Sequence, residues 1–207
     1  MGVMIDRFDV GPLQTNAFVV SDEEKNALII DAPPQSAKII DFLKLHRLNP
    51  IAILLTHAHF DHCMGITEIH EAFGTVPVYI QPNEKILLRN PDYNGSVMLG
   101  FSFVYHGATE DLKQGETSVG EFSFMVLEVY GHSPGGCAFL FENSCIVGDT
   151  LFAGSVGRTD FPGCDGTALL KNISEKIFTL PGNTIIYPGH GKSTTVEKEK
   201  KSNPFFR

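Results

Sequence analysis

The chain has 207 residues, which is enough for one well-buried domain and short for two. Hydrophobic residues make up 43% of it, as in ordinary globular proteins, yet no apolar run approaches the ~20 residues needed to cross a bilayer. The net charge of −8 argues against a nucleic-acid or membrane partner, because both favour a basic face.

The N-terminus and the cysteines both indicate a cytoplasmic protein. The first residues contain no basic segment followed by an apolar stretch, so we expect no signal peptide. No Cys-x-x-Cys spacing occurs among the four cysteines, which are Cys63, Cys137, Cys145 and Cys164. We therefore expect free thiols in a reducing compartment, and neither a zinc ribbon nor a thioredoxin-like pair.

Apolar periodicity predicts alternating strands and helices along the whole chain. In chain order the predicted elements are strands at Phe18–Val20 and Ala27–Ile30, a helix at Ser36–Leu45, a strand at Ile51–Leu55, a helix at Gly65–Phe73, strands at Val76–Ile80, Glu121–Val129, Cys137–Phe141 and Cys145–Val147, a helix at Ala168–Thr179 and a last strand at Thr184–Tyr187. Residues 83–115 contain a proline and several glycines, which predicts a short helix and long loops. Such alternation is typical of sheets covered by helices, and it leaves open whether there is one sheet or two.

The strongest chemical signal follows the apolar strand Ile51–Leu55. Four potential metal ligands lie within six residues there: His57, His59, Asp61 and His62. Histidines also cluster by chance or cap helices, but four ligand-type residues directly after a buried strand make chance a poor explanation.

Three later segments repeat this arrangement, in which an apolar strand leads through a small residue to a possible ligand. They end at His132, Asp149 and His190, and each ligand follows a glycine. Singly these signals are weak, because a lone histidine after a strand is more often a hydrogen-bonding loop residue. Together they place ligands at the C-terminal ends of four strands, where α/β folds usually build their sites.

Seven ligands are too many for one zinc ion and suit two ions that each keep room for water. We assign the first ion to His57, His59 and His132, the second to Asp61, His62 and His190, and a bridging role to Asp149. Imidazole combined with carboxylate suits zinc, iron or manganese. We therefore expect two divalent metal ions, with zinc as the first choice and iron or manganese as alternatives.

The charges of this cluster explain what it could catalyse. Two divalent ions outweigh the carboxylates of Asp61 and Asp149, so the site is positive although the chain is acidic. A local positive charge depresses the pKa of bound water towards ~7, against ~15.7 in bulk. The site would then offer a nucleophile at neutral pH and accept an anionic substrate.

The full set of motifs resembles the metallo-β-lactamase superfamily, and within it the small glyoxalase II-like hydrolases. The resemblance covers nearly the whole chain. It rests on the His-x-His-x-Asp-His motif and on six further segments, which are Gly11–Asn16, Gly131–Gly136, Gly148–Phe152, Gly157–Gly163, Pro188–Gly191 and Asn203–Phe205. The motif with its three later ligands is highly specific for the superfamily and moderately specific for the reaction.

The resemblance implies an αββα sandwich of two mixed sheets flanked by helices, with a dinuclear site at one edge between the sheets. It implies hydrolysis of a small thioester such as S-lactoylglutathione by a metal-bridging hydroxide, with Asp61 and Asp149 as catalytic ligands. We expect a single domain over residues 1–207. The C-terminal helical domain with which two-domain glyoxalase II enzymes bind glutathione is not expected here.

Other activities share this ligand pattern. A persulfide dioxygenase of the same superfamily holds one iron on two histidines and an aspartate, which match His57, His132 and Asp149, but the complete second ligand set favours the hydrolase. A lactonase would use the same dinuclear site on an ester. A β-lactamase fits less well, because its zinc-ligand patterns usually include a cysteine or replace part of this set. An RNA-processing nuclease fits less well because the chain is acidic. A binding module without catalysis fits less well because no ligand is missing.

Some remaining residues invite a functional interpretation. We expect Arg158 and Asp160 to form an ion pair that orders a loop beside the metals, and Asp31 to bind backbone near the site. We expect His46 at the end of a surface helix, His70 to be solvated or packed, and His106 in a loop, and we assign none of them a substrate contact. We expect Cys164 to be structural or incidental. The mildly basic tail, residues 192–207, is interpreted as a solvated helix face.

Overall fold

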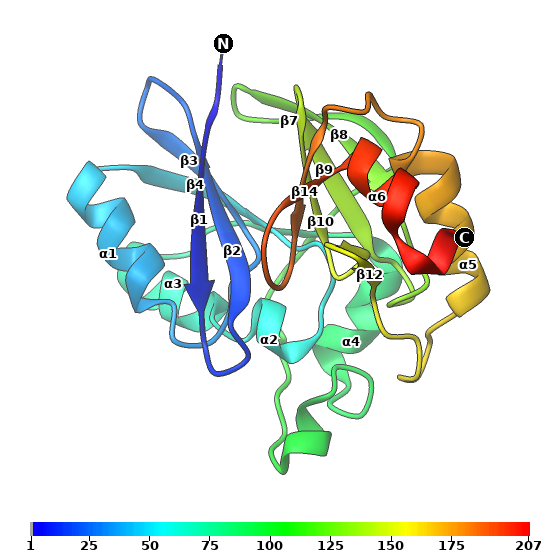
Figure 1. The fold of residues 1–207 in the computed structure, drawn as a ribbon. Coiled ribbons are helices and arrows are strands. Elements are labelled where there is room, and N and C mark those ends of the chain that lie inside the picture. The colour runs from blue at the N-terminus through cyan, green and yellow to red at the C-terminus, as the bar shows by residue number, and fades with distance from the viewer. Residues whose placement is uncertain (1) are drawn as a thin grey trace.

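A computed structural model describes residues 2–207 of the chain. Two six-stranded sheets face each other, and helices cover the outer side of each (Figure 1). In that view α1 and α3 lie beyond one sheet, and α5 and α6 lie beyond the other. The structure confirms the expected αββα sandwich of two mixed sheets and resolves the choice between one sheet and two.

The first sheet is built from the N-terminal half of the chain. Its strands, in spatial order, are β1 (Met4–Val10), β2 (Thr15–Ser21), β3 (Asn26–Ile30), β4 (Asn49–Leu54), β5 (Val78–Ile80) and β6 (Glu110–Asp111). The pairs from β1 to β3 are antiparallel, and those from β3 to β6 are parallel. The sheet is therefore mixed, and β4 lies in its interior.

The second sheet is built from the C-terminal half of the chain. Its spatial order is β14 (Thr194–Thr195), β13 (Ile185–Pro188), β10 (Ser144–Gly148), β9 (Cys137–Phe141), β8 (Phe122–Glu128) and β7 (Gly115–Val119). Only β10 and β13 run parallel in this sheet. A small two-stranded sheet, β11 (Leu151–Phe152) with β12 (Ser155–Val156), projects after β10.

Alternation along the strands divides the core into layers. In β2, Phe18 and Val20 point between the two sheets, where they pack with Phe124 and Phe139 of the second sheet. Val19, between them in sequence, points outward to the helices. Because successive side chains of a strand face opposite sides, a strand with both faces covered is apolar throughout, as β2 is from Ala17 to Val20.

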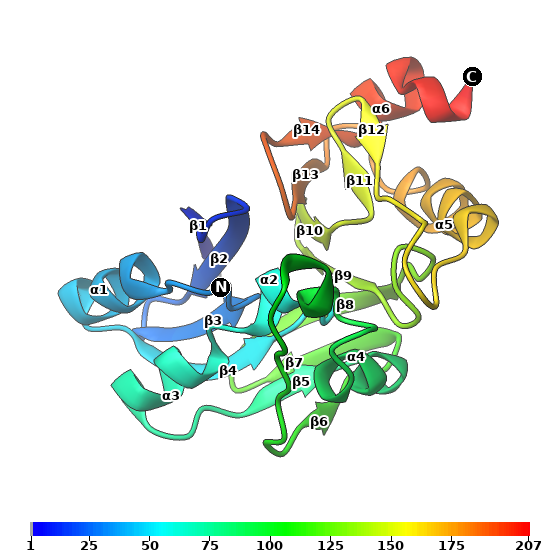
Figure 2. The same ribbon diagram turned by 90° about the horizontal axis from the view of Figure 1, so that it is seen from below.

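The helices bury one face each on the outer layers. The first sheet is covered by α1 (Ala37–His46), α3 (Ile66–Phe73) and α4 (Lys85–Arg89). The second is covered by α5 (Gly166–Asn172), which continues as a π-helical turn over Ile173–Ile177, and by α6 (Val196–Ser202). The view from below shows these helices on the two outer sides, with the short helix α2 (Phe60–Cys63) between the sheets (Figure 2). No helix within residues 2–207 is long and apolar enough to cross a membrane.

The predicted elements are all present, with shifts of a few residues at their ends. Thr184–Tyr187 is not the last strand, however, because β14 follows it and pairs with β13. The tail is only partly a solvated helix face. Its lysines are exposed, but Val196 and Glu199 are buried, and Glu199 accepts hydrogen bonds from Thr194, Gly154 and Asn203.

Candidate metal centre

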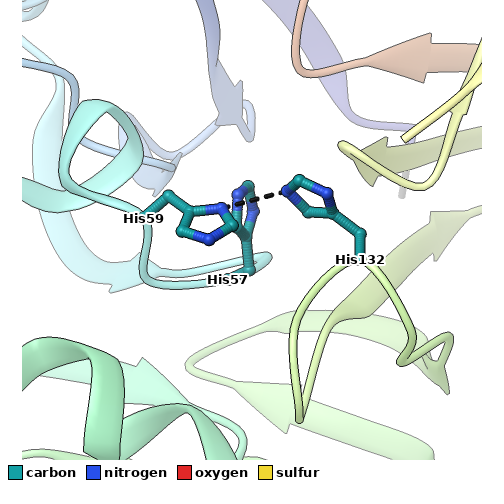
Figure 3. A group of neighbouring side chains, drawn as sticks. All are labelled: His57, His59 and His132. Atoms are coloured by element: carbon teal, nitrogen blue, oxygen red, sulfur yellow. Dashed lines mark hydrogen bonds between the residues drawn. The ribbon is translucent and has the colours of Figure 1, made fainter. Parts of the chain in front are cut away.

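The ligand-type residues all follow strands at one edge of the sandwich. His57 and His59 lie on the loop after β4, and Asp61 and His62 lie on α2, which begins at Phe60. The other three follow strands of the second sheet, with His132 after β8, Asp149 after β10 and His190 after β13. Figure 3 shows His57 and His59 on one loop and His132 on the facing loop, with the three rings close together.

The structure brings the seven predicted side chains together. Three sets have ligand atoms that lie within 4.8 Å of one another: His57 with His59 and His132, Asp61 with His62 and His190, and His57 with His62 and Asp149. The first two sets are the two triads expected from the sequence.

Asp149 lies between these triads. Its Oδ1 is 3.4 Å from His62 Nε2, and its Oδ2 is 3.7 Å from His132 Nε2 and 3.5 Å from His190 Nε2. Gly189 permits this approach, since a Cβ there would sit 2.2 Å from Asp149 Oδ1. The carboxylate therefore faces both halves of the cluster, as a bridging ligand would.

The chemistry of the cluster fits divalent metal ions. His57 Nε2, His62 Nε2 and Asp149 Oδ1 are buried without a hydrogen-bond partner. An unsatisfied buried polar atom costs about 1–3 kcal/mol, so three in one place point to a missing partner. Imidazole nitrogens and carboxylate oxygens are donors that suit zinc, iron and manganese.

Hydrogen bonds from outside the cluster orient three of the imidazoles. His62 Nδ1 lies 2.8 Å from Asp31 Oδ2, and His132 Nδ1 lies 2.8 Å from the carbonyl oxygen of Arg158. His57 Nδ1 lies 3.1 Å from the hydroxyl of Thr56. Because Nδ1 of each ring is engaged by the protein, Nε2 is left to face the cluster, which is how metal-binding histidines are usually held.

Asp31 also binds backbone, as expected. It accepts hydrogen bonds from the backbone N–H and from the hydroxyl of Thr56, each at 2.8 Å. The same carboxylate thus supports His62 directly and His57 through Thr56. Asp31 is itself buried and has a positive φ of 60°.

Burial sets the protonation of the cluster. Burial and neighbouring histidines lower the pKa of His57 well below its ordinary value, and burial lowers that of His59 to about 3. Burial raises the pKa of Asp149, but the imidazoles of His62, His132 and His190 outweigh it and hold the pKa below its usual range. Burial also lowers the pKa values of His62 and His190, but the carboxylates of Asp61 and Asp149 outweigh it and raise both. His57 and His59 therefore offer free lone pairs at neutral pH, whereas metal binding at His62 and His190 would displace a proton.

The Gln-Thr-Asn segment at Gln14–Asn16 acts on the ligands from the first sheet. Thr15 donates from its hydroxyl to Asp61 Oδ2 at 2.9 Å. The side-chain amide of Asn16 donates to the carbonyl oxygens of Pro188 and Gly191, on either side of His190. The segment therefore fixes one ligand directly and the loop of another.

Glu84 is a site residue that sequence reasoning missed. It is fully buried, and its carboxylate accepts hydrogen bonds from the backbone N–H groups of Ala58 and Gly135. Burial raises its pKa, and these hydrogen bonds oppose that rise. Its sequence signal was an acidic residue beside the apolar segment Ile86–Leu88.

Arg158 and Asp160 form the expected ion pair. Arg158 Nε and Nη2 each lie 2.7 Å from a carboxylate oxygen of Asp160, and both side chains are exposed. The guanidinium also lies 4.0 Å from the ring centroid of Phe161. That the pair orders the loop stays a prediction, although the carbonyl of Arg158 does hold His132.

The remaining histidines and Cys164 lie outside the metal-ligand sets found in residues 2–207. His46 ends α1 and packs on Phe42, and His70 hydrogen-bonds the carbonyl of Val76. Cys164 donates to the carbonyl oxygen of His132 at 2.8 Å, and burial raises the pKa of its thiol. A raised pKa does not favour a reactive thiolate.

The sequence and the fold have clear counterparts among known proteins. A model of the metallo-β-lactamase superfamily matches residues 10–190. A probable metallo-hydrolase of Bacillus subtilis, YqgX, is 41% identical over 96% of this chain and 95% of its own length. The hydroxyacylglutathione hydrolase GloC of Haemophilus influenzae is 33% identical over 97% of each chain.

Two solved structures are similar over nearly their whole length. The BLEG-1 B3 metallo-β-lactamase superposes with a TM-score of 0.93 at 39% identity, covering 98% of this chain and 99% of its own. The protein TTHA1623, solved in a di-iron-bound form, gives 0.86 at 36% identity, covering 97% and 99%. The chain therefore belongs to the metallo-β-lactamase superfamily, whose members bind divalent metals. It is a metallo-hydrolase of that superfamily.

Proposed function

We propose that this protein is a dinuclear thioester hydrolase of the hydroxyacylglutathione hydrolase type, with zinc as its first-choice metal. The observation that carries the proposal is the convergence of two ligand triads on the carboxylate of Asp149. Three ligand atoms of this cluster are buried without a hydrogen-bond partner. The proposal gives His57, His59 and His132 to one ion, Asp61, His62 and His190 to the other, and Asp149 to both.

The reaction adds water across the C–S bond of a thioester. A C–O bond forms at the carbonyl carbon, the C–S bond breaks, and the products are a thiol and a carboxylic acid that releases its proton to solvent. Bound divalent ions supply an activated water and a Lewis acid for the carbonyl oxygen.

The protein's own residues prepare this site. Asp31 and the carbonyl of Arg158 hold His62 and His132 by their Nδ1 atoms, and Thr15 holds Asp61. These contacts orient the ligands before substrate arrives, so little reorganisation is needed during the reaction.

The similarity to GloC supports a thioester of glutathione as the first substrate to test. The di-iron form of TTHA1623 supports testing iron beside zinc.

We place the enzyme in the cytoplasm as one catalytic domain over residues 1–207. The four cysteines, all without a disulfide, support a reducing compartment.

The direct test is turnover of S-lactoylglutathione by protein that has been stripped with a chelator and reloaded with zinc, iron or manganese. Turnover that disappears on stripping and returns on reloading supports the proposal. No thioester turnover with any of the three metals would refute it. Oxygen consumption on glutathione persulfide by a form with a single iron would favour the dioxygenase instead.

A further inference from the structure

A cavity of about 370 Å³ opens directly above the metal centre. Its floor is made by five of the ligand-type residues, which are His59, Asp61, His132, Asp149 and His190. A ligand in this cavity would therefore touch the reacting centre and the cavity walls at once. The size lies within the range of about 300–1,000 Å³ that is typical of small-molecule sites.

The walls come from four separate segments, and most of their large side chains are apolar. Leu13 comes from the turn between β1 and β2, Phe60 begins α2, and Phe161 follows the Arg158 loop. Met98 and Leu99 belong to a short 3-10 turn after α4 and are 64% and 57% exposed. Large apolar side chains left exposed around the mouth of a cavity are costly in water, and they commonly mark a binding surface.

The turn that carries Met98 and Leu99 is held in place against the site. Backbone N–H of Phe60 donates to the carbonyl of Asn94 at 3.0 Å, and the rings of Phe60 and Phe101 lie 5.3 Å apart. In Figure 2 this segment lies beside α2. Its exposed apolar side chains therefore belong to a fixed wall beside the ligands.

The polar side chains in the walls are already engaged within the protein. Asn94 is fully buried, and its amide donates to the carbonyls of Leu87 and Phe103 while its oxygen accepts from Ser96 N–H. Of the described residues, Arg158 is the one cationic side chain that lines the cavity. Two of its nitrogens are bound to Asp160, which balances its charge.

We infer that this cavity recognises a thioester whose acyl group is an apolar chain or ring, a selectivity that rests on the proposed function. The carbonyl would lie over the metal-binding floor, and the acyl group would pack against Met98, Leu99 and Phe161. A polar hydroxyacyl group such as lactoyl would find few partners on these walls. Apolar acyl groups would gain from burial, and each added methylene in an apolar pocket changes selectivity by about tenfold or more.

The test compares hexanoyl and lactoyl thioesters on the same glutathione carrier, using the metal-loaded full chain. We expect kcat/KM for the hexanoyl thioester to exceed that for the lactoyl thioester by about tenfold or more. The double variant Met98→Ser/Leu99→Ser should reduce that ratio by about tenfold. Leu45→Ser, which removes another exposed leucine, on α1 and outside the cavity lining, is the control and should keep the ratio of the parent.

A binding measurement separates recognition from catalysis. Amide analogues of the two thioesters, in which N–H replaces the sulfur, resist hydrolysis, and their affinities are measured by calorimetry. The hexanoyl analogue should bind more tightly than the lactoyl analogue, and this difference should shrink in the double variant.

The outcomes distinguish the two proposals. If the loaded protein hydrolyses neither thioester, the proposed function is wrong. A second outcome is that the protein hydrolyses the lactoyl thioester as well as or better than the hexanoyl one, with the same kcat/KM ratio in the parent and in the double variant. In that case the thioesterase stands and the apolar selectivity is wrong.

Discussion

Glu84 accepts a hydrogen bond from the backbone N–H of Gly135 at 2.5 Å, and this contact joins the two ligand loops. The second oxygen of the same carboxylate accepts from Ala58 N–H at 2.9 Å. Ala58 lies between His57 and His59 on the loop of the first sheet, whereas Gly135 follows His132 on the loop of the second. One buried side chain therefore connects two loops that carry ligands from opposite sheets.

Replacing Glu84 with glutamine should loosen the metal centre. The carboxamide keeps the size of the side chain but presents one N–H group towards a backbone N–H, so one buried donor loses its acceptor, at a cost of about 1–3 kcal/mol. We expect Glu84→Gln to weaken metal binding by about 10- to 100-fold, as changes beside metal ligands commonly do. Competition with a chromophoric chelator measures the affinity, and thermal unfolding measures the stability.

Glu24→Gln is the control for this substitution, because Glu24 is an exposed carboxyl in the turn between β2 and β3. It should match the parent in both measurements. Unchanged metal affinity in Glu84→Gln would show that the two loops hold their spacing without this carboxylate.

Removing a ligand should abolish activity and leave a folded protein. In His57→Ala or Asp149→Ala, we expect hydrolysis to fall by more than about 100-fold, beyond what loss of a supporting residue causes. Metal content should fall with activity, while the far-ultraviolet circular dichroism stays that of the parent. His46→Ala removes a histidine at the end of α1 and should keep both. Full activity in both ligand variants would refute the site.

Asp31→Asn tests the residue that supports His62 and Thr56. Asp31 has a φ of 60°, and asparagine tolerates this left-handed region better than most residues, so the backbone should not be strained. The amide lacks the second acceptor and the charge that orient His62, so we expect activity or metal affinity to fall about 10- to 100-fold. Restored activity at high added metal, with KM unchanged, would indicate that the defect lies in metal binding. Parental metal affinity and activity would contradict the supporting role.

The buried thiols should resist modification in the folded protein. Burial raises the pKa of Cys145 to about 12 and raises those of Cys63 and Cys137 well above the ordinary value, so all three are protonated thiols at pH 8. Titration with a disulfide reagent at pH 8 should detect at most the half-buried Cys164 before denaturant is added and four thiols afterwards. Rapid reaction of two or more native thiols would contradict the packing around them.

Much of the ligand set was predictable because its geometry is local. His57, His59, Asp61 and His62 share one segment, and the later ligands each follow an apolar strand. Strands whose C-terminal ends meet at one edge bring such residues together whatever their separation in sequence. The pattern could therefore predict the two triads from the order of elements alone.

Residues that act across the fold were less predictable. Glu84 meets Gly135 only because the turn before α4 packs against the His132 loop, 51 residues further along the chain. β1 was missed because Asp6, Arg7 and Asp9 interrupt its apolar residues, as an edge strand allows. β14 has two residues, too few for any periodicity to show.

The most direct test of this account is the metal content of the purified protein, measured by mass spectrometry together with the protein concentration. The seven-ligand site predicts two metal ions per chain after reloading, and fewer in Asp149→Ala. A saturating value of one ion per chain, unchanged in Asp61→Ala and His190→Ala, would contradict the dinuclear centre on which the proposed hydrolysis depends.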